Sequence, residues 1–160
     1  GVARVVAVNY VGVRRYGRRA RDVLAVGAGG GGRWGEDLGP PQLVVCAVAE
    51  TRAEALDVAP LMVTQYLGQQ PHIMKASGVP ESLLEEIGRV RTLTATHEQV
   101  EAGSKLVADE IVQMICADGT ADEVQEKWAQ YMADACTCPI SYPLGPDVSM
   151  MIDVFADWTP

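Results

Sequence analysis

Four side chains have types and positions that suit chemistry: His72, Glu50, Ser141 and Tyr142. An imidazole is the group best suited to general acid–base catalysis near neutral pH, although a histidine at a protein surface often has no such role. Glu50 can transfer a proton, or it can add favourable negative charge to the start of the helix predicted after it. Ser141 and Tyr142 place hydroxyls near the end of a predicted strand. We take the first two as catalytic candidates and the last two as cofactor-binding candidates.

The cysteines do not form a metal-binding pattern. They are Cys46, Cys116, Cys136 and Cys138. Only the last two are close, and their single intervening residue differs from the two-residue spacing of zinc sites. His72 and His97 are isolated in the sequence. We therefore predict no metal site, and we expect buried thiols that pack as small apolar side chains.

A run of glycines near the amino terminus invites a second chemical interpretation. Gly27, Gly29 and Gly32 resemble a phosphate-binding loop, but such a loop needs a strand before it and a helix directly after it. Trp34 and a pair of prolines follow instead. We interpret residues 27–41 as a flexible loop.

Composition limits the classes of function. The chain has 160 residues, 48% of them apolar, which suits one globular domain or a piece of a larger one. A net charge of −8 argues against nucleic acid as a partner. No apolar run is long enough to span a membrane, and residues 1–13 lack the pattern of a signal peptide. We therefore expect no membrane partner and a cytoplasmic protein.

Charge and glycine divide the chain near residue 42. Residues 1–41 hold seven of the 13 basic residues against three acidic ones, and ten of the 16 glycines. The remaining 119 residues carry six basic and 18 acidic residues. We assign 1–41 as an Arg/Gly-rich irregular segment, either a linker or a sequence read out of frame, in which 2–8 suits a strand and 14–26 a basic helix. Residues 42–160 form the ordered part.

The first half of the ordered part begins with a strand. Residues 43–48 are continuously apolar, which is typical of a parallel strand covered on both faces. Thr51 and Glu54 then form a capping box that opens a helix, and Pro60 predicts a kink or break in it. Residues 69–79 suit an irregular segment, and Pro80 opens a short helix.

The second half has the clearest local signals. A capping box at Thr96 with Gln99 predicts another helix start, and Thr120 with Glu123 predicts a helix from 121 to about 135 with Trp128 buried. Residues 136–142 are apolar and too short for a helix, so we predict a second buried strand. Turn residues at 143–146 end it.

Three segments resemble a known family: VVCAVAETRAEALDVAPLMVTQYLG, HIMKASGVPESLLEEI and ICADGTADEVQEKWAQYMADACTCPISYPLGPD. They are similar to the carboxyl-terminal part of the bacterial-luciferase-like oxidoreductases, over residues 43–158. Within that superfamily the likeness is to the deazaflavin-dependent branch, which includes the methylenetetrahydromethanopterin reductases. The most specific elements are G-T-x-D-E-V at 119–124 and P-L-G-P-D at 143–147.

The resemblance implies an α/β fold, the carboxyl-terminal part of a (β/α)8 TIM barrel, with residues 43–48 as its seventh strand and 138–142 as its eighth. It implies hydride transfer between reduced coenzyme F420, a deazaflavin, and a small-molecule substrate. An FMN-dependent monooxygenase, and a noncatalytic fragment or assembly partner, remain alternatives. With two confident strands, we expect the chain alone to be either inactive or self-associated as a homo-oligomer through exposed sheet edges.

Overall fold

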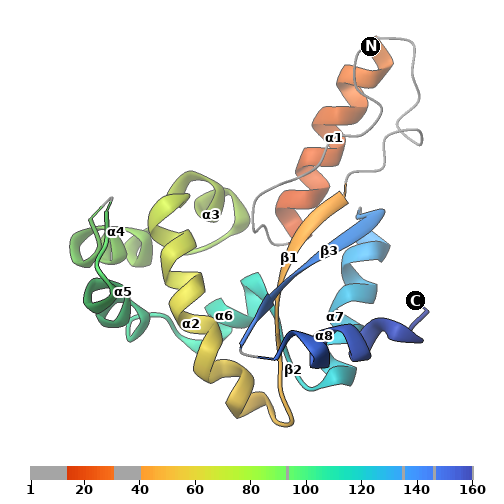
Figure 1. Cartoon of the computed structure of the whole chain (residues 1–160). Coiled ribbons are helices and arrows are strands. Elements are labelled where there is room, and N and C mark those ends of the chain that lie inside the picture. Colours follow the sequence, from red (N-terminus) through yellow and green to blue (C-terminus); the bar gives the residue numbers. More distant parts are fainter. Residues whose placement is uncertain (1–13, 31–40, 93, 135, 146, 160) are drawn as a thin grey trace.

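A computed structural model describes residues 14–30, 41–92, 94–134, 136–145 and 147–159. The strands are β1 (Pro41–Val48), β2 (Cys116–Gly119) and β3 (Cys138–Leu144). The helices are α1 (Arg14–Gly30), α2 (Arg52–Gln69), α3 (Pro71–Ser77), α4 (Glu81–Val90), α5 (His97–Ser104), α6 (Asp109–Ile115), α7 (Ala121–Asp134) and α8 (Val148–Ala156). Figure 1 shows α2, α7 and α8 beside the small sheet and α3, α4 and α5 beyond α2.

The sheet is parallel, with the strand order β2-β1-β3. The predicted strand at 43–48 is confirmed as the central strand β1, whose residues 44–47 are fully buried. The sequence indicated about two strands, and the structure adds a third, β2. Its four residues follow α6 without a break, and their Asp and Gly are residues typical of turns, so pairing with β1 and not local preference makes them a strand.

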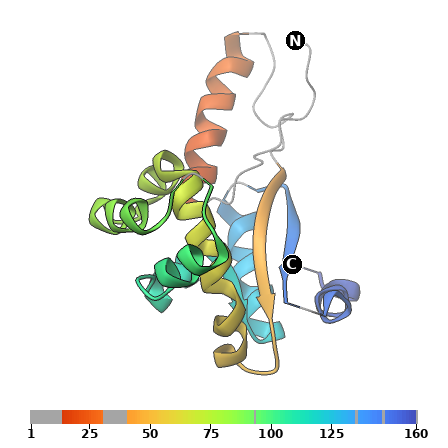
Figure 2. The same ribbon diagram turned by 60° about the vertical axis from the view of Figure 1, so that its left-hand side comes forward.

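Helices cover both faces of β1, as the alternation of its side chains requires. Val45 and Ala47 pack with the core of α2, whereas Val44 and Cys46 pack against α7 and α8. Figures 1 and 2 show α2 on one side of the sheet and α8 on the other. In a closed barrel, strands that follow one another along the chain are neighbours. Here β2 and β3 instead lie on opposite sides of β1.

The prediction that residues 136–142 form a buried strand was partly wrong. The strand is present, but it spans Cys138–Leu144 and most of it is exposed or half-buried. The reason is its place at the edge of the sheet, where no other described strand pairs with its outer side. Ile140 and Tyr142 are consequently 44% and 38% exposed.

The segment between β1 and β2 is more helical than the sequence indicated. Helix α2 continues through Pro60 as one helix, since the proline removes only the bond to the carbonyl of Leu56 and the buried face continues on both sides of it. Residues 69–79, predicted to be irregular, contain α3, which buries Ile73 and Met74. Helix α3 ends at Gly78 in the left-handed conformation, with φ 105°.

Helix α1 corrects part of the assignment of residues 1–41. The predicted basic helix is present, but it extends to Gly30 and so includes the start of the predicted loop. Arg14 and Arg18 form ion pairs with Asp134 at 3.2 and 2.9 Å, which attach α1 to the end of α7. The strand expected at 2–8 lies outside the described residues. No helix in the described part of the chain is long and apolar enough to cross a membrane.

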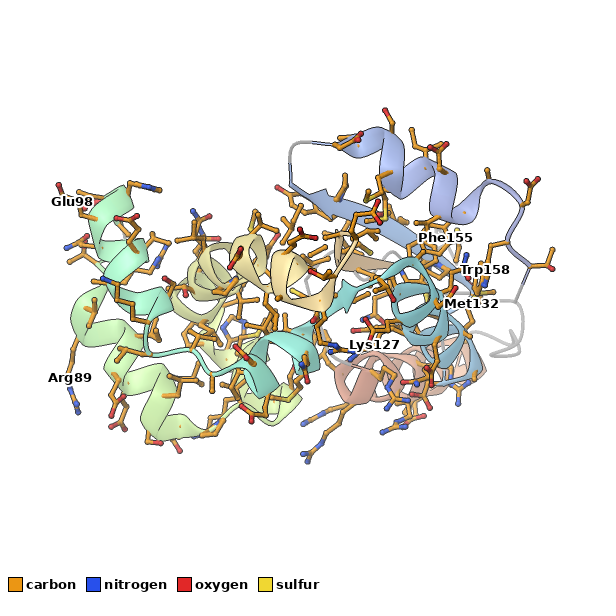
Figure 3. All side chains as sticks on the ribbon, turned by 90° about the horizontal axis from the view of Figure 1, so that it is seen from below. Arg89, Glu98, Lys127, Met132, Phe155 and Trp158 are labelled. Atoms are coloured by element: carbon orange, nitrogen blue, oxygen red, sulfur yellow. The ribbon has the colours of Figure 1, made fainter. Side chains whose placement is uncertain are left out.

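Helix α7 confirms the predicted helix from residue 121. Trp128 is 8% exposed and its indole Nε1–H donates to the Cys46 sulfur at 3.2 Å. Its ring stacks on Phe155 of α8 with centroids 4.0 Å apart and meets Trp158 edge-on at 6.4 Å. These aromatic rings attach α8 to α7. Figure 3 shows Phe155 and Trp158 beside α7.

Candidate functional site

An open cleft of about 550 Å³ lies at the carboxyl ends of the strands. Three segments line it: residues 48–50 at the end of β1, residues 120–122 at the start of α7, and residues within 147–154 at and after the start of α8. Figure 3 looks onto this end of the molecule. Because parallel strands end at the same edge of a sheet, loops distant in sequence meet there, and α/β proteins commonly bind ligands at this edge.

The two segments that carry the most specific family resemblance meet in this cleft. Thr120, Ala121 and Asp122 belong to the G-T-x-D-E-V segment, and Asp147 ends the P-L-G-P-D segment. About 25 residues separate them in sequence, so only the parallel pairing of β2 and β3 with β1 brings them together. The cleft is therefore the best candidate for a functional site.

Hydrogen bonds fix the walls of the cleft. The amide of Ala49 donates to the carbonyl of Gly119 at 3.1 Å, which extends the pairing of β1 with β2 beyond the strand end. The carboxylate of Asp147 caps α8 by accepting from the amides of Ser149 and Met150 at 2.9 and 3.3 Å. These hydrogen bonds fix the backbone of two sides of the cleft, the connection after β1 and the start of α8.

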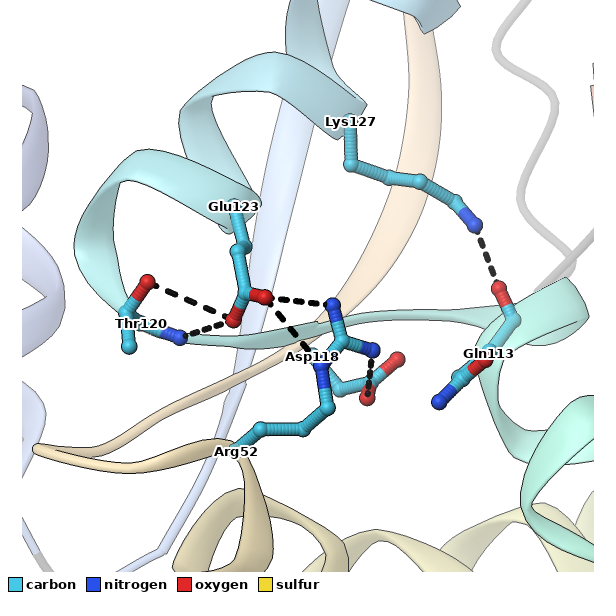
Figure 4. A network of polar contacts seen from close by, with 6 residues as sticks. All are labelled: Arg52, Gln113, Asp118, Thr120, Glu123 and Lys127. Carbon is cyan, nitrogen blue, oxygen red and sulfur yellow. Dashed lines mark hydrogen bonds and ion pairs between the residues drawn. The ribbon is translucent and has the colours of Figure 1, made fainter.

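A polar network beside the cleft ties α2, β2 and α7 together (Figure 4). The Arg52 guanidinium donates to Glu123 Oε1 through Nη2 at 2.6 Å and Nε at 3.2 Å, and its Nη1 lies 3.7 Å from Asp118 Oδ2. Lys127 of α7 donates to the backbone carbonyl of Gln113 in α6. The network holds the start of α7, and with it residues 120–122, in place.

The cap of α7 differs in one respect from the predicted capping box. The Glu123 carboxylate accepts from the Thr120 amide at 2.9 Å, as expected. The Thr120 hydroxyl, however, lies 3.3 Å from the same carboxylate and donates to it. These bonds hold the pKa of Glu123 below its usual value. The bond from the Thr120 amide has the largest effect, and the bond from Arg52 the next largest.

Asp118 is the most buried carboxylate of the network. Its side chain is 2% exposed, and its Oδ2 has no hydrogen-bond partner among the described residues, since 3.7 Å to Arg52 is an ion-pair distance only. Burial raises the pKa of Asp118, and the charges of Arg52 and Lys127 oppose that rise. Burial likewise lowers the pKa of Lys127.

The cleft carries one sign of charge. Glu50, Asp122, Asp147 and Asp153 line it, and none of the described lining residues is basic. Flavin mononucleotide and the deazaflavin coenzyme both carry phosphate, which binds where Arg, Lys or free helix amides converge. The described residues of the cleft therefore do not fit a cofactor phosphate, but they suit an uncharged or positively charged group.

The structure separates the residues that the sequence singled out. Glu50 lines the cleft. His72 lies in α3, which follows the end of α2 distant from the cleft (Figure 1), and it lines a different hollow of about 260 Å³. Ser141 and Tyr142 lie within β3, and neither lines the cleft. Ser141 lies beside the Cys46 thiol. Tyr142 points to the other face of the sheet, because successive side chains of a strand alternate between its faces.

The residues that sequence reasoning missed are acidic and lie after strand ends. Asp122, Asp147 and Asp153 line the cleft, yet each looked like an ordinary residue of a helix start or helix surface. The available signal was the position of Asp122 and Asp147 inside the two family-specific segments. The expectation for the cysteines was also wrong at one position, because Cys138 is exposed.

Comparisons with known proteins agree with this geometry. A sequence model of the luciferase-like monooxygenase family matches residues 2–137. That match covers most of the chain, so the chain belongs to the luciferase-like monooxygenase family. It includes most of the Arg/Gly-rich segment, which the resemblance at residues 43–158 had left out. Curated proteins compared with the sequence gave no significant match.

Solved structures support the fold. The coenzyme F420-dependent tetrahydromethanopterin reductase of Methanopyrus kandleri superposes with a TM-score of 0.77 at 18% identity, covering 98% of this chain and 44% of that one. A riboflavin lyase solved with modified FMN and riboflavin gives 0.50 at 15% identity, covering 96% and 37%. The chain thus spans less than half the length of either protein. Its α/β fold corresponds to part of a TIM barrel.

Proposed function

We propose that the chain serves a luciferase-like oxidoreductase that transfers a hydride between a reduced deazaflavin coenzyme and a small organic substrate. The observation that carries the proposal is the cleft, where both family-specific segments meet at the carboxyl ends of parallel strands. Membership of the family and the fold shared with an F420-dependent reductase support it. The cofactor supplies the hydride chemistry, and the protein supplies orientation and exclusion of water.

In this proposal the acidic cleft receives the substrate. Four carboxylates around an open hollow favour a substrate that is uncharged or positively charged. Glu50, on the connection that Ala49 pins to β2, is placed to hold such a group or to exchange a proton with it. The phosphate of the coenzyme then binds outside the described cleft.

An FMN-dependent monooxygenase is the second candidate function. The family is named for monooxygenases, and one similar structure contains modified FMN. The two functions differ in what accepts electrons from the cofactor, because a monooxygenase consumes oxygen whereas a deazaflavin reductase passes a hydride to an organic acceptor. Oxygen consumption therefore separates them.

The test measures both reactions with two preparations. The first is this chain alone, and the second is this chain extended at its amino terminus by upstream barrel sequence of the family. Reduced coenzyme F420 is mixed anaerobically with a panel of small neutral and cationic acceptors, and return of the oxidised deazaflavin absorbance is followed. Reduced FMN is mixed with oxygen, and uptake above the buffer rate is followed. Acceptor-dependent deazaflavin oxidation supports the proposal. Oxygen uptake with FMN alone supports the monooxygenase, and neither reaction in either preparation supports a noncatalytic role.

A pair of variants tests the cleft itself. Glu50→Gln removes one carboxylate from the cleft, and we expect weaker binding of cationic acceptors, seen as a higher KM. Glu98→Gln is the matched control, since Glu98 is exposed on α5, away from the cleft (Figure 3). Equal effects of the two changes would contradict the placement of the substrate.

A further inference from the structure

Helix α1 has an exposed face that the proposed function does not use. Along it, Arg15, Arg19, Val23 and Val26 follow one another at spacings of four, four and three residues, which places them on one side of a helix. All four are exposed, Val23 at 66% and Val26 at 79%. We call these four residues the α1 face. It combines two guanidinium groups one turn apart with two valines that have little cover.

The two arginines of the α1 face are not used to hold α1 in place. That role belongs to Arg14 and Arg18, which form the ion pairs with Asp134. Arg15 and Arg19 form no ion pair with any other described residue. Arginine is enriched in protein interfaces, where it pairs with carboxylates of a partner. An exposed face with unpaired arginines and apolar side chains is therefore suited to contact with a partner.

The α1 face and the cleft lie at opposite ends of the molecule. The cleft is at the carboxyl ends of the strands. Helix α1 meets the sheet at the other end, where Gly17 lies beside the side chain of Gln42 near the start of β1, and Figures 1 and 2 show it reaching away from the sheet. The α1 face therefore cannot reach the cleft of its own copy. Two copies arranged head to tail bring the α1 face of one to the cleft of the next.

The cleft has the complementary chemistry. Glu50, Asp122 and Asp153 line it with exposed carboxylates. Its apolar lining consists of Val48, Ala49, Ala121, Met150 and Val154. Carboxylates match the guanidinium groups of the α1 face, and the apolar lining matches its valines, so that charge and apolar surface agree together.

An anionic membrane or a nucleic acid also attracts arginine, but the rest of the chain opposes both. Residues 42–160 carry six basic and 18 acidic residues. A lipid surface or a phosphate backbone would repel this part of the chain when α1 approached it. A second copy of the chain instead presents an acidic surface of its own. The observations therefore favour a second copy as the partner.

We propose that the α1 face binds in the acidic cleft of a second copy of this chain. The two surfaces differ, so the contact is heterologous and can repeat from copy to copy. One helix face buries less area than a standard interface, and its ion pairs are screened by salt, so the association is weak and strongest at low ionic strength. The proposal rests on the proposed function in one respect, since a bound α1 face competes with a cationic acceptor only if the cleft receives one.

The experiment is sedimentation velocity of the full 160-residue chain over a range of concentrations, at low and high salt and without cofactor. We expect the wild type to sediment faster as concentration rises at low salt and as a monomer at high salt. Arg15→Glu combined with Arg19→Glu should stay monomeric at low salt, and so should Glu50→Lys combined with Asp153→Lys. A mixture of these two variants should associate again, because the reversed α1 face meets a reversed cleft.

The matched control is Glu86→Lys combined with Glu98→Lys. Both glutamates are exposed and neither lines the cleft. This variant changes the net charge as much as the cleft variant does, and it should associate as the wild type does. The control thus separates the cleft from a general effect of charge. Circular dichroism of each variant shows that it is folded before sedimentation.

Three results would overturn the proposal. The first is a wild type that stays monomeric at every concentration and salt level. The second is association of either double variant at the wild-type level, or a mixture of the two that stays monomeric. The third is binding of the wild type to vesicles of phosphatidylserine and phosphatidylcholine without self-association, which would assign the α1 face to a membrane. None of these measurements involves hydride transfer, so a failed deazaflavin assay leaves their outcome unchanged.

Discussion

Trp128→Ala tests the packing that joins α7 to the sheet. The side chain is 8% exposed, lies against Val44 and Cys46 of β1, and stacks on Phe155. Replacing a large buried aromatic side chain by alanine costs about 3–5 kcal/mol, because the transfer free energy is lost and a cavity remains. Within that total, the ring contacts account for about 0.5–1.5 kcal/mol each. The bond to the Cys46 sulfur is a further, weaker part.

The free energy of unfolding should be measured by urea titration with far-ultraviolet circular dichroism, because the substitution changes the fluorescence signal. A loss of about 3–5 kcal/mol is a large part of the stability of about 5–15 kcal/mol typical of a domain, so the midpoint should fall steeply.

Trp158→Ala is the matched control for this prediction. Trp158 is half-buried and touches Trp128 and Phe155 only edge-on, with centroids 6.4 and 5.5 Å apart. We expect it to cost less than half as much as Trp128→Ala. An unchanged midpoint in Trp128→Ala, or equal losses in the two variants, would refute the assignment of Trp128 to the core.

Three further predictions concern the cleft and the sheet. The raised pKa of Asp118 means that the folded state holds its proton more tightly than the unfolded state, so this group's contribution to stability falls as pH rises from about 4 through the raised pKa. Asp118→Asn should therefore gain stability relative to the wild type over that range in urea titrations at several pH values, and a constant difference would contradict it. Gly119→Ala should destabilise the protein by more than about 1 kcal/mol in thermal melts, since φ is 127° and an added Cβ would collide with Glu123 Oε2. Gly145→Ala is the control and should cost less, because φ is 100° there but an added Cβ would meet open space. Replacing Pro139 and Pro143 together by valine should promote self-association, which analytical ultracentrifugation would detect; unaltered sedimentation would show that the β3 edge is not protected in this way.

The reason for the proline prediction lies in the direction of the backbone groups. The amide of Ala49 donates to β2. The backbone N–H and C=O groups of the odd-numbered residues of β1 therefore point toward β2, and those of the even-numbered residues point toward β3. By the observed register, residues 138, 140, 142 and 144 then pair with β1. The backbone groups of the residues between them point to the free edge of β3, and these residues are Pro139, Ser141 and Pro143. Two of these three residues are prolines, which have no N–H to donate to another strand. This arrangement opposes the association expected from the sequence.

Local signals in the sequence predicted most of the elements correctly. The capping boxes at Thr51 and Thr96 are present as expected, because both partners of such a box lie within four residues of each other. The continuous apolar run of β1 and the helical spacing in α7 likewise depend on near neighbours. Family membership was also visible in the sequence, since it rests on the order of residues within segments.

The tertiary structure decided what depends on distant pairing. Strand β2 exists because β1 offers it hydrogen bonds, and β3 is exposed because it lies at an edge of the sheet, which no local pattern encodes. The cleft likewise forms only when the three strand ends meet, which brings Glu50, Asp122 and Asp147 to one place. Sequence spacing alone could not separate Glu50, which lines the cleft, from His72, which lines a different hollow, because side chains far apart in the chain become neighbours only through the register of parallel strands.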